Sequence, residues 1–369
     1  LGICINLSNL YHTYQYSKES MRGKSELVKE NSANQTNSGL ERDYITQWSY
    51  GIGETFTLLV PNTKGGASVP LAMNEKAMEK ANPMYMNIYR QIGQYWGEQP
   101  GTSGPVYVGA FVMFLFVLGL FIVKGPMKWA LLVATILSIL LSWGKNFMGF
   151  TDFFIDYIPM YSKFRTVSSI LVVAEFTIPL LGMLALKELV ERPQLIKERM
   201  KDFLISFGLT GGLALLFALA PRVFFSSYVS TMEMHALQGI PADQLVPLLA
   251  NLEEVRMSMF TADAWRSFFI ILIGVALLWS YSAGKLKPVT LVGSLIVLCL
   301  IDMWDVNKRY LYDGQFVEKI EQTRTFEPTE TDKQILLDKD LNYRVLNLAS
   351  NTFNENNTSY WHKSIGGYH

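Results

Sequence analysis

The chain has 369 residues and a formal net charge of zero, with 50% hydrophobic and 17% charged residues. This neutral balance, without a dense basic run, gives no argument for nucleic-acid binding. The two cysteines, Cys4 and Cys299, lie far apart in apolar segments. They are too few for a metal site of the CxxC type and do not indicate a disulfide.

Residues 1–10 are apolar and carry neither a start methionine nor the cationic segment of a signal peptide. We therefore expect the end of a preceding transmembrane helix here, in a fragment of a longer protein. The polar residues 11–103 are predicted to form an external loop region. Within this region, residues 49–62 are apolar and interrupted by glycines, and Lys64 with the two following glycines predicts a turn.

Six long apolar runs in the middle of the chain predict a helical polytopic membrane protein. They are residues 104–123, 127–143, 167–186, 203–220, 265–281 and 286–304. Each has about 17–20 residues, the length that a helix needs to cross a hydrocarbon core of roughly 30 Å. Only a helix satisfies its own backbone hydrogen bonds in lipid. Residues 104–304 are thus predicted to hold six transmembrane helices.

Lysine and arginine residues in the short connections indicate the orientation of these helices. They concentrate in 124–128, 187–202 and 282–288, which we therefore place on the cytoplasmic side. The loops 144–166 and 221–264 then lie outside, together with 11–103 and the C-terminal region.

Two polar segments outside the runs have a predicted structure of their own. In the loop 221–264, leucine and valine residues spaced three or four apart after Pro241 predict an amphipathic helix at the interface or against the bundle. Residues 305–369 are predicted to be the start of a C-terminal external domain. The alternation over 343–348 predicts a β-strand in that domain.

Glu175 lies inside the third apolar run, where an ionisable group is costly and suggests a function. Its spacing from Arg165, Val172 and Gly182 predicts one shared helix face that looks into the bundle. A structural alternative is equally open. In that case Glu175 is protonated or hydrogen-bonded to a neighbouring helix, and Arg165 reaches toward lipid headgroups.

Lys145 and Lys163 precede Arg165 in the loop 144–166 and place three cations near the outer boundary of the bilayer. A planar guanidinium suits bidentate contact with a phosphate, so this group predicts a site for a lipid phosphate or pyrophosphate. General attraction to lipid headgroups explains the same cations.

Four carboxylates lie near the outer ends of the spans, namely Glu54, Glu98, Asp302 and Asp305. Such groups bind divalent cations or act as acids and bases, although an isolated carboxylate is more often simply solvated. The four histidines have no metal-ligand spacing, and we assign no metal ligands. A P-loop, a nucleophile elbow and a dinucleotide fingerprint are also missing from the sequence.

Several short stretches together resemble the YfhO family of bacterial membrane proteins. They are SYGIGETFTLLVPNTKGG at 49–66, YWGEQPGTSGPVYVG at 95–109, residues 143–165 with Pro159 and the Phe164-Arg165 ending, YRVL at 343–346 and SIGGY at 364–368. Each is a weak motif alone, and their occurrence in family order over nearly the whole chain carries the resemblance.

The resemblance implies a GT-C-like helix bundle in the bacterial cytoplasmic membrane, with large regions on the external face. Such proteins are similar to glycosyltransferases that transfer a sugar from a polyprenyl-phosphate carrier to an envelope glycan, polymer or lipid. The resemblance implies that the principal catalytic aspartate precedes residue 1, and that this fragment is inactive alone. Phe164-Arg165 matches the family, but Thr166 and Ser168 stand where relatives often continue with proline and a second arginine.

Under this hypothesis Arg165 and Lys145 neutralise the departing phosphate. A carboxylate, from Glu54, Glu98 or the expected loop before residue 1, deprotonates the acceptor hydroxyl or holds a divalent cation, the one cofactor that we consider. Two other classes stay open. A transporter or flippase of lipid-linked glycans would use Glu175 and Arg165 to line a cavity. A non-catalytic scaffold for envelope assembly would need neither residue.

Overall fold

The computed structural model describes residues 2–20, 22–23, 32–36, 39–324 and 326–367. Leu1, expected at the end of a preceding helix, and Tyr368, in the last family motif, lie outside these ranges. The chain divides into two compact units, Leu1–Tyr310 and Leu311–His369.

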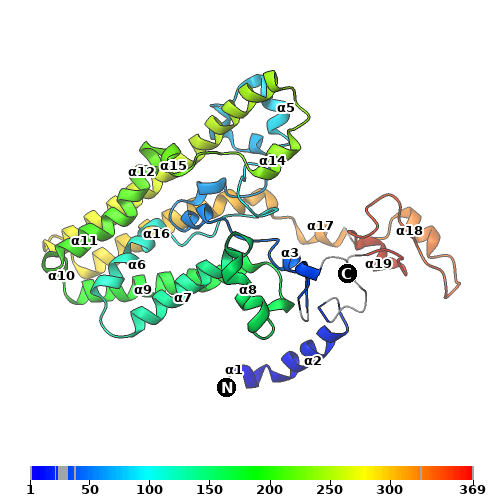
Figure 1. Cartoon of the computed structure of the whole chain (residues 1–369), viewed down its shortest axis with the longest axis horizontal. Helices are drawn as coiled ribbons and strands as arrows, with labels where there is room; N and C mark the ends of the chain where they lie inside the picture. Colours follow the sequence, from blue (N-terminus) through cyan, green and yellow to red (C-terminus); the bar gives the residue numbers. More distant parts are fainter. Residues whose placement is uncertain (1, 21, 24–31, 37–38, 325, 368–369) are drawn as a thin grey trace. The chain divides into compact units, whose positions relative to one another are not determined.

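Long apolar helices form a bundle in the first unit (Figure 1). They are α6 (Ala110–Ile122), α7 (Met127–Ser142), α9 (Val172–Glu191), α11 (Met200–Phe207), the π-helical η9 (Gly208–Gly212), α12 (Leu213–Leu219), α15 (Ala242–Ser282) and α16 (Pro288–Tyr310). Within the described residues, four helices are long and apolar enough to cross a membrane: Val167–Glu191, Met200–Leu219, α15 and α16. The chain is thus mostly helical, as a polytopic membrane protein requires.

The first two predicted runs form different structures from the other four. The second run, α7, continues after a 109° bend into Gly144–Tyr157, and the pair counts as a fifth span if it is one broken helix. The first run contains only α6, with 13 residues. Pro105 and Gly109, whose φ is 97°, keep the chain before α6 non-helical, so this run is shorter as a helix than as an apolar segment.

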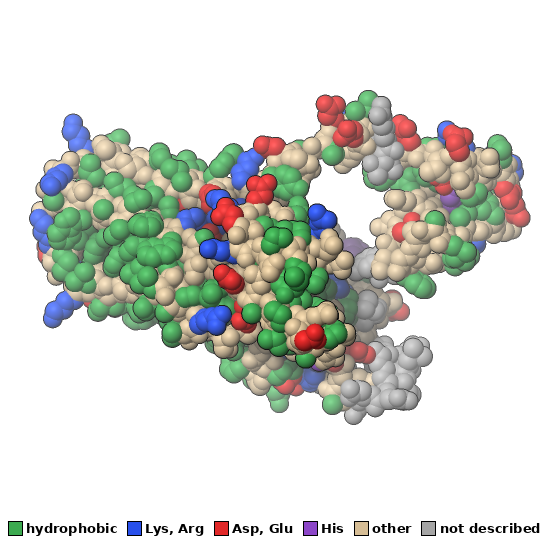
Figure 2. Space-filling model, turned by 90° about the horizontal axis from the view of Figure 1, so that it is seen from above, with side chains coloured by type: hydrophobic (Ala, Val, Ile, Leu, Met, Phe, Trp, Pro, Cys, Tyr) green, Lys and Arg blue, Asp and Glu red, His purple; other side chains and the backbone are tan. Residues whose placement is uncertain are grey.

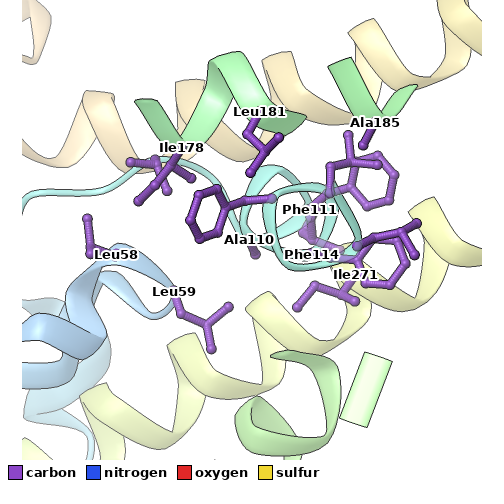
Figure 3. Packing of buried hydrophobic residues seen from close by; sticks show 14 of the residues in the cluster. Leu58, Leu59, Ala110, Phe111, Phe114, Ile178, Leu181, Ala185 and Ile271 are labelled. Atoms are coloured by element: carbon purple, nitrogen blue, oxygen red, sulfur yellow. The ribbon is translucent and has the colours of Figure 1, made fainter. Parts of the chain in front are cut away.

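The core of the bundle forms around α6. Phe111 and Phe114 lie among Leu181 of α9 and Ile271 of α15 (Figure 3). Glycine permits this approach, because a Cβ on Gly119 of α6 would lie 3.0 Å from the Leu181 Cγ atom. Small residues at such contacts let helices approach closely in a membrane, where the hydrophobic effect does not drive their association.

The helix α15 changes one prediction. The expected interface helix in 221–264 and the fifth apolar run form one continuous helix of 41 residues. At 1.5 Å per residue it is about 60 Å long, roughly twice the hydrocarbon thickness. The predicted amphipathic face is present, since Leu248, Leu252 and Val255 are buried against Leu71 and Tyr89. The two segments merge because no helix-breaking residue separates them.

Short helices and turns form the region before α6. They are α1 (Gly2–Ile5), α2 (Leu7–Lys18), η1 (Ser32–Asn34), α3 (Arg42–Ile45), η2 (Gly53–Leu58), η3 (Pro61–Lys64), η4 (Leu71–Met73), α4 (Glu75–Met78), η5 (Pro83–Tyr85) and α5 (Met86–Tyr89). The predicted helix end at 1–10 is helical over residues 2–5 and 7–10.

The two ends of the bundle differ in character. The connections 124–128, 187–202 and 282–288 lie at one end, and the turns η2 and η3 lie toward the other (Figure 1). Figure 2 shows hydrophobic side chains over the helices and lysine and arginine side chains at the end with the short connections. In the middle of this view lysine and arginine side chains are also present, mixed with acidic side chains.

The second unit contains η10 (Asp313–Gln315), α17 (Lys319–Arg324), α18 (Glu330–Ile335) and α19 (Asn357–Trp361). It begins at Leu311, because α16 continues past 305 to Tyr310. The strand predicted at 343–348 is not confirmed. Its described residues form a single parallel bridge, between Val345 and Ser364. Alternation alone does not make a strand, since a strand also needs a neighbour along its length.

Candidate functional site

Three loops meet at the end of the bundle away from the lysine-rich connections. They are residues 49–66, 95–105 and 143–168. The Lys145 backbone N–H donates to the Ser49 hydroxyl over 2.8 Å, and the Ser168 hydroxyl donates to the Gln99 side chain over 3.1 Å. The Trp96 N–H donates to the Lys64 carbonyl over 3.0 Å. The glycine-rich sequence at 49–66 favours short 3₁₀ turns over a long helix, and these turns bring the loops together.

Glu54 is the most buried carboxylate of this site, with 1% of its surface exposed. It accepts hydrogen bonds from the Gly51 N–H over 2.6 Å, the Glu98 N–H over 3.2 Å and the Tyr95 hydroxyl. Burial raises the pKa of Glu54, and these three hydrogen bonds only partly oppose the rise. Its proton affinity thus moves toward the range in which a carboxylate serves as a general base.

A small pocket lies beside Glu54, with room for roughly one water molecule. It is lined by Tyr50, Glu54, Thr57, Lys64, Gly66, Tyr95, Gln99, Thr102, Gly104 and Pro105. Burial lowers the pKa of Lys64, while the charges of Glu54 and Glu98 act in the opposite direction. The pocket therefore combines a carboxyl group and an ammonium group, both taken partly out of water.

Glu98 and Lys145 do not line this pocket but are linked to Glu54 by hydrogen bonds. The Glu98 side chain is exposed, while its backbone N–H donates to Glu54. Its carbonyl accepts a hydrogen bond from Lys145 Nζ over 3.1 Å, and Lys145 is itself exposed. Three residues predicted from the sequence, Glu54, Glu98 and Lys145, are thus joined by direct hydrogen bonds.

Arg165 lies in the same layer of loops but contacts different residues. Its guanidinium donates to the Tyr44 hydroxyl over 2.6 Å. The Arg165 Cζ atom lies 5.2 Å and 5.4 Å from the ring centroids of Tyr44 and Trp48, within cation–π range. Trp48 in turn donates to the Gly101 carbonyl over 3.2 Å, which links Arg165 to the loop that carries Glu98.

Glu175 lies in the first turn of α9 and is exposed, and Val172 is 62% exposed. The predicted face that looks into the bundle is therefore wrong for these two residues. The spacing argument also assumed a helix from Arg165 onward, but Thr166 has a φ of 66° and α9 begins only at Val172, so Arg165 does not share a helix face with Glu175. Glu175 still lies near the site. Burial is the main cause of the raised pKa of Tyr50, the charge of Glu54 comes next, and the charge of Glu175 is a smaller cause.

A cluster of charged side chains beneath these loops was predicted only in part from the sequence. Asp302 is 2% exposed and accepts from Arg266, from the Tyr107 hydroxyl over 2.8 Å and from the Ala110 N–H over 3.0 Å. Asp302 and its neighbour Asp305 were named as candidate acids or metal ligands, whereas Arg266 and Arg309 were not considered. The sequence signal for this cluster was Arg266, an arginine at the start of the apolar run 265–281.

This charged cluster is connected to the pocket loop. Asp263 accepts from Arg309 over 2.7 Å and from the Asn62 N–H over 3.1 Å. Arg309 also donates to Asp305 over 2.6 Å. Asn62 belongs to η3, the turn that ends at Lys64, so the cluster fixes the base of that turn. Within the described part of the chain, no three His, Cys, Asp or Glu residues gather in a way that could hold a metal ion.

Arg256 of α15 is fully buried and was also missed. Its guanidinium forms a two-pronged contact with Glu233 and donates to the Tyr228 carbonyl over 2.9 Å and the Gly93 carbonyl over 2.5 Å. Its Cζ atom lies 5.3 Å from the Trp96 ring centroid. Through these contacts the outer half of α15 holds the loop 93–96, which supplies one wall of the pocket.

Comparison of the chain with protein-family models, with curated proteins and with solved structures gave no match.

Proposed function

We propose that the chain belongs to a GT-C-like glycosyltransferase of the bacterial cytoplasmic membrane, related to the YfhO family. It would transfer a sugar from a polyprenyl-phosphate carrier to an envelope glycan, polymer or lipid on the external face. The observation that supports this most is the buried carboxyl of Glu54 beside a small pocket, within loops that also carry Lys145 and Arg165.

The chemistry follows from the position of these groups. A polyprenyl chain lies in the bilayer and presents its phosphate at the helix ends, where the three loops meet. Glu54 accepts the proton of the acceptor hydroxyl as the acceptor oxygen bonds to the sugar. The bond between the sugar and the phosphate oxygen breaks, and Lys145 and Arg165 neutralise the charge on the departing phosphate. Tyr95 donates to Glu54 and, because burial raises the pKa of Tyr95, keeps its own proton.

The charge pattern supports the proposed orientation. The lysine-rich connections at the opposite end of the bundle would face the cytoplasm and place the site outside. The exposure of Glu175 gives less support to the transporter, because that reading needs Glu175 to line an interior cavity. Transport and a scaffold role remain as the outcomes that the following experiment distinguishes.

The test is sugar transfer by the full-length protein in liposomes, with a labelled polyprenyl-phosphate sugar and an envelope extract as acceptor. Glu54→Gln should lower kcat by about 100-fold or more, because the general base is lost. Arg165→Ala should lower transfer as well, because the charge on the departing phosphate is then less well neutralised. Glu191→Gln and Arg192→Ala are matched controls, since both residues are at the lysine-rich end of the bundle.

Normal transfer by Arg165→Ala or Glu54→Gln would contradict the proposed roles. Movement of labelled lipid across the bilayer without transfer would favour the flippase. Retention of envelope assembly in all of these variants, without either activity, would favour the scaffold.

A further inference from the structure

Lys64 forms no direct ion pair within the described residues, although Glu54 and Glu98 lie within electrostatic reach. Its side chain is half-buried, and its ammonium lies 5.1 Å from the ring centroid of Phe225. Among the described residues, no carboxylate oxygen lies within 4.0 Å of Lys64 Nζ and no hydrogen bond joins it to an acceptor. Taking an ammonium out of water without such a partner costs free energy. A bound anion would offset this cost by pairing with the Lys64 ammonium.

The other cations of the site already have contacts. Lys145 donates to the Glu98 carbonyl from an exposed position, and Arg165 donates to Tyr44 and stacks on two aromatic rings. Lys64 alone among these cations lines the pocket beside Glu54. It is therefore the cation that a ligand in the pocket would meet first.

The backbone around Lys64 is held in place. Its carbonyl accepts from the Trp96 N–H over 3.0 Å. Gly65 and Gly66 follow with φ values of 86° and 76°, which favour glycine. A Cβ at Gly65 would overlap the Gln94 carbonyl and the Trp96 ring, so the turn is packed tightly against the loop 94–96. A fixed backbone and a side chain laid on Phe225 preorganise the ammonium for binding.

We propose that Lys64 binds a phosphoryl oxygen of a polyprenyl phosphate, at the edge of the pocket beside Glu54. The pocket holds roughly one water molecule, too little for a phosphoryl oxygen and the acceptor hydroxyl together, so the phosphoryl oxygen would meet Lys64 at the edge of the pocket and leave Glu54 accessible to the acceptor. The ammonium also lies within electrostatic reach of Glu54 and Glu98 and would offset their repulsion of a phosphate. The identity of the lipid rests on the proposed function, whereas the need of Lys64 for an anion does not.

The experiment measures binding in nanodiscs of the full-length protein, with a polyprenyl phosphate as the probe and the uncharged polyprenol as its neutral counterpart. Lys64→Met should weaken phosphate-lipid binding by about tenfold or more, because a charge-assisted hydrogen bond is lost. Binding of polyprenol should not change. Lys64→Arg, which keeps the charge, should bind better than Lys64→Met. Lys76→Met is the matched control, since Lys76 is exposed and far from the pocket lining.

A second readout identifies misfolding. Lys64→Met should have a Tm at or above that of the wild type, because it removes an unpaired cation from a half-buried position. Polyprenyl phosphate should raise the Tm of the wild type and not that of the variant. A folded Lys64→Met protein with wild-type affinity for the phosphate lipid would overturn the proposal.

Two further results separate this inference from related ideas. If inorganic phosphate displaces the lipid at equal concentration, the lipid assignment is overturned, although Lys64 remains a phosphate contact. If Lys64→Met loses lipid binding while the wild type transfers no sugar, the proposed function fails and the phosphate site stands. If the wild type transfers sugar and Lys64→Met binds the phosphate lipid with wild-type affinity, the proposed function stands and the proposed phosphate site at Lys64 fails.

Discussion

Glu54 should make the stability of the protein depend on pH, because burial raises its pKa in the folded state. A carboxyl with a raised folded pKa contributes stability below its unfolded value of about 4.3 and loses it as the pH rises through the folded value. Glu54→Gln removes this dependence. The amide nitrogen can face the Tyr95 oxygen, and the amide oxygen can accept from the Gly51 and Glu98 N–H groups.

We expect the Tm of the wild type to fall relative to that of Glu54→Gln between pH 4 and pH 8, measured in one detergent. Glu191→Gln, an exposed glutamate of α9, serves as the control. Parallel curves for the wild type and Glu54→Gln would show that the fold does not penalise the ionised carboxylate.

Gly97 should not tolerate a side chain, because a Cβ there would overlap the Glu54 carboxyl and the Tyr95 hydroxyl. We expect Gly97→Ala to lower the free energy of unfolding by about 1–3 kcal/mol, the usual cost of overpacking. Gly149→Ala is the control, since nothing lies within 4 Å of its added Cβ. Equal denaturant midpoints for the two variants would contradict the packing around Glu54.

At the scale of elements, the charged cluster between α15 and α16 should behave as a unit. Arg266→Met leaves Asp302 buried without its cation, and we expect a loss of about 3–5 kcal/mol. Adding Asp302→Asn should recover part of this loss, because the variant then buries no unpaired charge. Denaturant unfolding of the wild type, the two single variants and the double variant gives the coupling free energy. Additive single effects would show that the pair does not interact.

The elements also show where the sequence was sufficient and where it was not. The length of the apolar runs located four of the spanning helices, and periodicity located the buried face of α15, since both follow from local patterns. It did not show that α15 continues from the loop into the span, because helix ends depend on tertiary packing. It predicted a strand at 343–348, although a strand depends on a partner that local alternation does not specify.

The candidate site, like the fold, could be predicted from the sequence only in part. The sequence pointed to Glu54, Glu98, Lys145 and Arg165, because carboxylates and cations near span ends stand out in an apolar chain. It overlooked Lys64, which lies in a glycine turn, and Arg256, which is buried through contacts with residues distant in sequence. Burial and long-range pairing are properties of the folded chain, and single-sequence patterns do not report them.

At the scale of the whole molecule, membrane topology tests whether the 13-residue α6 crosses the bilayer. We expect cysteines placed at Lys128, Lys197 and Lys285, in a background without Cys4 and Cys299, to react with an impermeant maleimide from one side only. A cysteine at Thr102 should react only from the other side. Reaction of positions 102 and 128 from the same side would show that α6 does not span and would change the proposed orientation.

The length of α15 gives the molecule a mechanical property. One unbroken rod runs from the bilayer to the segment 71–92, and on its way it contacts Leu59 through Ser267 and Trp96 through Arg256. A tilt of about 10° would displace a point 30 Å along such a rod by roughly 5 Å. Helices tilt to match bilayers of different acyl-chain length. A tilt of α15 would therefore shift the loops that form the walls of the pocket. We therefore expect the shape of the pocket to depend on the thickness of the membrane.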